Sequence, residues 1–130
     1  MFRIDPLSRT PIYEQIIVQL EDLVLSGAIS PNDPIPSVRS LSLQLKTNPN
    51  TIQKAYSELD SRGIISSVPG KGCFVCANAK NILSKRALRH IEEISELCKK
   101  LKLAGIGEEE IISAVKQAFD TNNDPKGDNI

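Results

Sequence analysis

The chain has 130 residues, with 16 Lys and Arg against 16 Asp and Glu, so its formal net charge at pH 7 is zero. That length suits one small domain, or one domain with an appendage. The apolar fraction of 40% and the charged fraction of 25% are ordinary for a globular protein. No apolar run is long enough for a transmembrane helix or a signal-peptide core, and a neutral chain is not a uniformly basic polyanion binder. Three cysteines, an odd count, and no secretory signal fit a reducing cytoplasm, so we expect a cytoplasmic protein with no membrane partner.

The neutral total hides blocks of opposite charge. Residues 12–35 hold four acidic and no basic side chains, whereas residues 36–72 hold five basic and two acidic ones. Residues 80–102 are again basic, and residues 103–130 are acidic. A localised positive face can therefore meet an acidic partner although the whole chain is neutral.

A first helix is predicted to begin at Thr10 and Pro11, with Thr10 as N-cap and Pro11 at the first helical position. Apolar residues then recur every three or four positions, and Gly27 is placed to end the helix in a left-handed conformation. Residues 31–36 contain three prolines and are expected to form a rigid loop.

Two short helices joined by a turn follow. Ser37 is a predicted N-cap for the first, and residues 46–47 are long enough only for a turn. Asn48 followed by Pro49 is a second helix start, and Gly63 ends that helix. The inner faces of the two helices consist of Val38, Leu41, Leu45, Ile52, Ala55, Tyr56 and Leu59. This pattern is typical of a helix-turn-helix.

A β-hairpin is predicted next, because two β-prone runs, residues 64–68 and 73–76, flank a Pro/Gly turn at 69–72. A hairpin that follows a helix-turn-helix is a wing. Residues 1–76 are thus predicted to form a winged helix-turn-helix domain of the α+β class.

The remainder is predicted to be helical. A helix over about 79–104 carries a heptad-like apolar seam, residues 105–107 break it, and a last helix follows. Two such helices cannot enclose a core, so we expect residues 77–119 to form an all-α segment for homodimerisation. The predicted dimer-interface residues are Ala87, Ile91, Ile94, Cys98, Leu101, Ile111, Ile112, Val115 and Phe119. Residues 120–130 are polar and are expected to be a disordered tail.

The helix that starts at Asn48 also carries short hydrogen-bonding side chains and one cation on its outer face. Asn and Gln can pair with adenine in the major groove, and Lys can pair with guanine. A free helix N-terminus suits a phosphate, and cations on the preceding helix and on the wing can reach the same duplex. The predicted contacts to double-stranded DNA are Ser37, Arg39, Asn48, Asn50, Thr51, Gln53, Lys54, Gly70, Lys71 and Gly72.

These segments resemble the GntR family of bacterial transcription regulators, and in particular its YtrA-like subfamily. The resemblance lies in residues 11–16, 36–41, 48–56, 63–65 and 70–75, together with Leu59. It implies a dimeric repressor on an inverted-repeat operator, in a subfamily often found beside transporter operons. The positions that match the family's DNA contacts and wing tip are Arg39, Asn50, Thr51, Gln53, Gly70 and Gly72.

Two other hypotheses remain open at this stage. Winged helices can also dock proteins, so a protein-interaction module is the first alternative. The C-x-x-C spacing of Cys73 and Cys76, with Cys98 elsewhere, raises a thiol- or metal-sensing DNA binder as the second. Residues three apart on a strand face opposite sides, which is poor for chelation, so we expect no metal and no cofactor.

The sequence contains few candidate catalytic residues. His90 is the one histidine, and no marked nucleophile stands beside it in the sequence. The roughly 50 residues after the wing are too few to enclose a drug-sized pocket in one chain. We therefore expect a protein that is not an enzyme, and the sequence does not identify a small-molecule effector.

Overall fold

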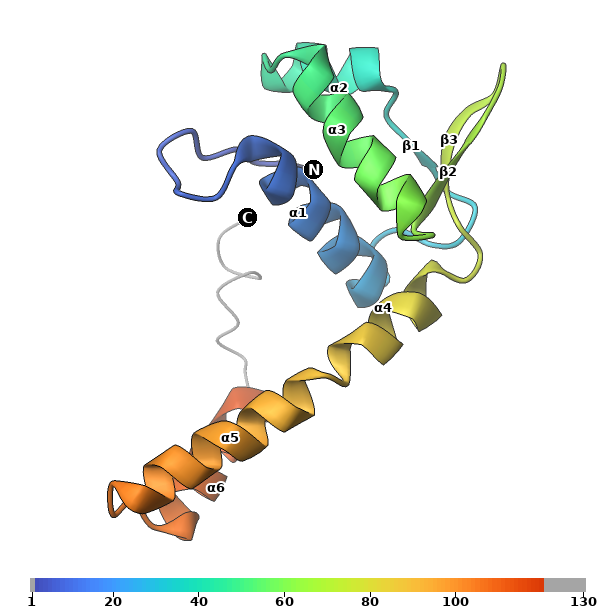
Figure 1. Cartoon of the computed structure of the whole chain (residues 1–130). Coiled ribbons are helices and arrows are strands. Elements are labelled where there is room, and N and C mark those ends of the chain that lie inside the picture. The colour runs from blue at the N-terminus through green and yellow to red at the C-terminus, as the bar shows by residue number, and fades with distance from the viewer. Residues whose placement is uncertain (1, 121–130) are drawn as a thin grey trace. The chain divides into compact units, whose positions relative to one another are not determined.

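The computed structural model describes residues 2–120 and divides the chain into two compact units, separated between Ala87 and Leu88. The first unit contains α1 (Ile12–Ser26), α2 (Val38–Leu45), α3 (Pro49–Ser61) and α4 (Ala79–Ala87), as Figure 1 shows. Its strands are β1 (Pro34–Ile35), β2 (Ile65–Val68) and β3 (Gly72–Val75). The second unit contains α5 (His90–Leu103) and α6 (Glu108–Phe119). The α+β winged-helix fold with a helical C-terminal segment is confirmed.

The start of α1 differs from the prediction. Its N-cap is Pro11, with no side-chain cap hydrogen bond, and Thr10 lies outside the helix. The reason is that the first helical hydrogen bond runs from the Gln15 amide to the Pro11 carbonyl at 3.1 Å, whereas the Thr10 carbonyl accepts from Gln15 Nε2 at 2.8 Å. Gln15 Nε2 also donates to the Asp5 carbonyl at 2.9 Å, so this side chain binds the loop that precedes α1. At the other end, Gly27 adopts a left-handed φ of 82° and its N–H donates to the Val24 carbonyl, as predicted.

Both predicted caps of the helix-turn-helix are confirmed. The Ser37 hydroxyl accepts from the Ser40 amide at 3.0 Å and begins α2. Asn48 Oδ1 accepts from the Asn50 amide at 2.8 Å and begins α3, with Pro49 as the first helical residue. Each cap satisfies an amide that the helix leaves free, so a short local sequence signal marks where α2 and α3 begin.

The sheet is antiparallel, with strand order β1-β3-β2. The predicted hairpin of β2 and β3 is confirmed, and Val68 pairs with Gly72 at its tip. The prediction of a plain loop over residues 31–36 is wrong, because Ile35 is buried and pairs with Cys73 on the far edge of β3. Proline is tolerated there because β1 is an edge strand, which does not need every N–H for the ladder.

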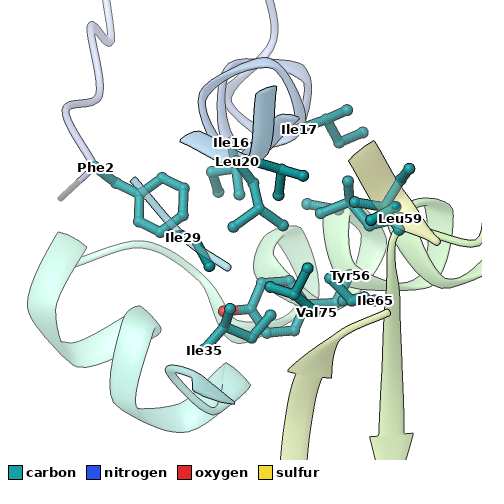
Figure 2. Close-up of a cluster of buried hydrophobic side chains, with 14 of the residues drawn as sticks. Phe2, Ile16, Ile17, Leu20, Ile29, Ile35, Tyr56, Leu59, Ile65 and Val75 are labelled. Carbon is teal, nitrogen blue, oxygen red and sulfur yellow. The ribbon is translucent and has the colours of Figure 1, made fainter. Parts of the chain in front are cut away.

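The hydrophobic core of the first unit lies between α1, α3 and the sheet (Figure 2). Leu20 of α1, Leu59 of α3 and Val75 of β3 are among its fully buried side chains. Tyr56 adds a polar link, because its hydroxyl donates to the Pro36 carbonyl at 2.6 Å. Burial raises the pKa of Tyr56, and nearby Cys73 raises it further. The core therefore ties α3 both to α1 and to the segment that leads into α2.

The C-terminal half is divided differently from the prediction. A single helix over about 79–104 was expected, but the chain turns at residues 88–89, between α4 and α5. Ala79 and Leu83 are buried in the core of the first unit, so that unit continues to Ala87 rather than stopping at residue 76. The expected tail, residues 120–130, lies outside the described residues apart from Asp120, the C-cap of α6.

We predict that Leu20→Ala lowers the free energy of unfolding by about 2–5 kcal/mol, because it opens a cavity between α1 and α3. Urea unfolding followed by circular dichroism measures the change. Leu43→Ala is the matched control: Leu43 is 72% exposed on α2, and its truncation is expected to change stability by no more than about 0.5 kcal/mol. Equal effects of the two substitutions would contradict the described core.

Candidate nucleic-acid interface

The outer face of α3 is lined by exposed polar side chains. Asn50, Gln53, Lys54 and Ser57 are exposed, whereas Thr51 is half-buried. Gln53 Nε2 donates to Ser57 Oγ at 3.1 Å, one helical turn further along. This face offers amide and hydroxyl groups that can donate and accept hydrogen bonds, which is what base edges require.

The first turn of α2 contributes a cation beside this face. Arg39 is exposed, and no described side chain forms an ion pair with it. Ser37 is also exposed, but its hydroxyl is engaged as the N-cap of α2. Arg39 is therefore available for a partner, whereas the observed role of Ser37 is to begin the helix.

The hairpin tip supplies a second exposed cation. Gly70 and Gly72 have φ values of 77° and 109°, which favour glycine, and the Lys71 amide donates to the Val68 carbonyl at 2.9 Å. Lys71 itself is exposed. The two glycines thus form the tight turn that places this cation at the end of the β2–β3 hairpin (Figure 1).

A groove of about 220 Å³ joins the outer face of α3 to the hairpin. Gln53, Ser57 and Asp60 of α3 line one side, and Ser67 and Cys73 of the hairpin line the other. Gln53 therefore lies on the hairpin side of α3. Because helix, groove and hairpin form one continuous surface, a single extended ligand can contact all three.

Lys54 lies on the opposite edge of α3, toward α1. Its Nζ is 3.9 Å from the centre of the Tyr13 ring. The Tyr13 hydroxyl donates to Glu14 Oε1 at 3.2 Å, and this hydrogen bond raises the pKa of Tyr13. Sequence reasoning missed Tyr13, because the contact joins residues far apart in the chain.

Arg62 does not contribute its charge to this surface. Its Nε donates to Glu58 Oε2 at 2.9 Å, and its Nη1 donates to Glu21 Oε2 at 3.1 Å. Burial alone would lower the pKa of Arg62, but the hydrogen bonds with Glu58 and Glu21 outweigh it and raise the pKa. The positive charge of residues 36–72 is therefore concentrated on Arg39, Lys46, Lys54 and Lys71.

The three cysteines are free and half-buried. Cys73 Sγ lies 3.3 Å from Ser67 Oγ, across the hairpin. Within residues 2–120, no group of three or more His, Cys, Asp or Glu side chains is arranged to hold a metal ion. A search of the same residues finds no helix long and apolar enough to span a membrane.

Comparisons with known proteins identify this arrangement. The model of the family "Bacterial regulatory proteins, gntR family" matches residues 12–75, which run from the start of α1 to the end of β3. The HTH-type transcriptional repressor YtrA of Bacillus subtilis (strain 168) is 42% identical over 118 residues, covering 90% of this chain and 91% of YtrA.

Solved structures agree with this match. A crystal structure of a transcriptional regulator from Oenococcus oeni aligns with a TM-score of 0.72 at 32% identity, covering 89% of this chain and 97% of that one. AraR(DBD) in complex with operator ORX1 aligns with a TM-score of 0.51 at 35% identity, covering 58% of this chain and 93% of that one.

The fold and the surface thus define a winged helix-turn-helix transcription regulator with a DNA-binding domain, not an enzyme. The chain belongs to the gntR family of bacterial regulatory proteins and is YtrA-like. The resemblance inferred from residues 11–75 is confirmed. The individual DNA contacts predicted on α2, α3 and the wing stay predictions.

We predict that Asn48→Ala lowers the free energy of unfolding by about 0.5–2 kcal/mol, because the Asn50 amide at the start of α3 loses its cap. Thermal and urea unfolding measure the loss. Asn48→Ser keeps a capping oxygen and is expected to retain most of the stability. A loss that is the same for the alanine and serine variants would show that the cap is not what Asn48 contributes.

Proposed function

We propose that this regulator is a repressor that binds an inverted-repeat operator as a homodimer. The observation that carries the proposal is the groove that joins the polar face of α3 to the first residue of α2 and to the hairpin, with exposed cations nearby in the chain at Arg39 of α2 and Lys71 of the wing. A protein-docking face would not need cations on the helix-turn-helix and on the wing, whereas a DNA duplex offers phosphates along both edges of its major groove.

Each part of this surface suits a different part of the duplex. We infer that α3 enters the major groove with its N-terminal half, where Asn50 and Gln53 pair with base edges. Asn48 and the free amides beside it face a phosphate, because a helix N-terminus attracts anions. Arg39 contacts a base or the flanking backbone, and Lys71 lies along the adjacent minor groove.

The dimer is supported by the second unit. Neither α5 nor α6 has a buried residue, although both are amphipathic. Ile94 is 52% exposed, Val115 is 45% exposed and Phe119 is 88% exposed. Apolar faces of this kind mark interaction sites, and a second copy of the same chain supplies a matching face. We therefore propose α5 and α6 as the dimerisation segment.

The other predicted interface residues fit this assignment to different degrees. Ile91, Leu101 and Ile112 are exposed apolar residues of the same two helices, and Cys98 and Ile111 are half-buried. Ala87 instead is the last residue of α4 in the first unit. The interface that we propose therefore begins with α5.

The two-fold symmetry of a homodimer accounts for the inverted repeat, because each copy reads one half-site in the opposite orientation. The YtrA-like resemblance supports a role beside transporter genes, and we propose that the regulated operon encodes a transporter. Since its proposed target is chromosomal DNA, we place the protein in the cytoplasm.

The DNA-binding proposal is tested by selecting an operator from random duplexes and measuring affinity by fluorescence anisotropy across salt concentrations. Arg39→Ala and Gln53→Ala are each expected to weaken binding to the selected operator by about 1–3 kcal/mol. Lys71→Ala is expected to weaken binding to all sequences alike and to reduce the salt slope by about 1 per subunit.

Lys85→Ala is the control, since it removes one charge from the exposed side of α4 and is expected to leave affinity unchanged. Enrichment of no inverted repeat, or unchanged affinity in the Arg39 and Gln53 variants, would contradict the proposal.

The dimer is tested by Ile94→Asp, which places a carboxylate in the apolar face of α5. We expect this variant to be monomeric at micromolar concentration in light scattering, because an unpaired charge cannot be buried in an interface. Leu103→Asp is the matched control: Leu103 is 89% exposed on the opposite side of α5, so its variant is expected to stay dimeric. A monomeric wild-type chain, or a dimeric Ile94→Asp variant, would overturn the assignment.

A further inference from the structure

A buried carboxylate joins three helices of the first unit. Glu21 of α1 is 6% exposed, and both of its oxygens are used. Oε2 accepts from Arg62 Nη1 at 3.1 Å, and Oε1 accepts from Arg86 Nη2 at 2.6 Å. Burying a charge is costly unless it is paired and hydrogen-bonded, so Glu21 depends on these two guanidinium groups.

The two arginines belong to elements with different tasks. Arg62 is the C-cap of α3, the helix that carries the proposed base contacts, and it is also held by Glu58. Arg86 lies in the last turn of α4, immediately before the chain leaves the first unit. The Glu21 carboxylate therefore holds the C-terminal end of α3 and the C-terminal end of α4 together.

Arg86 is the anchor of the last turn of α4. Leu83 is the last residue of α4 that is buried in the core, and Ser84, Lys85 and Ala87 are exposed. Arg86 is half-buried and reaches back to α1 through Glu21. Without that ion pair, the end of α4 would have no core contact to hold it and would fray, because helix ends are the least stable part of a helix.

We propose that the Arg86–Glu21 ion pair fixes the direction of α4 up to the end of the first unit, and so narrows the range of half-site spacings that the dimer accepts. The inference rests on the proposed homodimer and its inverted repeat. Arg86 acts here as a positioning residue, which touches no DNA and acts through α4.

The helical geometry of DNA links the spacing of two half-sites to their relative orientation, so the direction of α4 can affect which spacing is bound. Adding one base pair between half-sites moves them about 3.4 Å apart and rotates one by about 35° around the duplex axis. A dimer in which both α4 helices keep their direction up to Ala87 accepts a narrower range of offsets, because less of the chain between the two units can adjust. A dimer in which the ends of α4 fray accepts a wider range of offsets. The second DNA-binding unit of such a dimer then has a lower effective concentration at the preferred half-site spacing, which weakens binding there.

The test uses the full chain and duplexes that carry one half-site, the selected operator, or the operator with one base pair inserted or removed. In Arg86→Gln, Glu21 keeps its pairing with Arg62, so we expect the variant to fold. We expect the affinity ratio between the selected and the altered spacings to fall about fivefold or more, with single half-site affinity kept within about twofold. Amides in the last turn of α4 are expected to exchange about tenfold faster or more.

Two further variants sharpen the result. Lys85→Gln removes the same charge from the neighbouring exposed position and is expected to keep both the spacing preference and the exchange rates. Arg86→Lys retains the charge but not the planar fork of donors, so we expect it to restore part of the preference.

An unchanged spacing ratio in Arg86→Gln overturns the inference, as do unchanged exchange rates in the last turn of α4. Equal losses of affinity for the single half-site and for every spacing also overturn the inference, because they would show only that the DNA-binding unit is weakened. A wild-type chain with no spacing preference is a different result: it contradicts the proposed inverted-repeat dimer, and the role of Arg86 in spacing falls with it.

Discussion

The packing of α3 against α1 positions the other elements of the first unit. Ile52 and Leu59 of α3 are fully buried, as are Ile16 and Leu20 of α1. Two polar links complete the placement: the Tyr56 hydroxyl on the Pro36 carbonyl, and the Arg62 guanidinium on Glu21. A helix held along one face and at its end presents its outer side chains in one orientation, which base recognition requires.

The same packing explains how a neutral chain can carry a DNA-binding surface. Acidic side chains of α1 and α3 are used within the fold, where Glu21 and Glu58 hold Arg62. The cations that remain on the surface include Arg39 in the first turn of α2 and Lys71 at the tip of the wing. Because affinity for any sequence grows with the number of phosphates neutralised, few cations mean weak non-specific binding. Under the proposed function, selectivity then depends on base contacts and on the two DNA-binding units of a homodimer.

Local features were predictable from sequence, and long-range ones were not. Ser37 and Asn48 cap amides two or three residues ahead, so short sequence signals sufficed for both helix starts. The pairing of Ile35 with β3 and the bridge from Glu21 to Arg86 join distant parts of the chain, which periodicity cannot reveal. The turn at residues 88–89 contains no Gly or Pro, so nothing in the apolar pattern marked the division between α4 and α5.

We propose that α3 and the wing of each of two copies hold one half-site. Hydroxyl-radical footprinting of the wild-type chain on its selected operator tests this directly. We expect two protected backbone tracts related by two-fold symmetry, with the minor-groove flank of each tract losing protection in Lys71→Ala. A single asymmetric tract, or flank protection that persists in that variant, would contradict it.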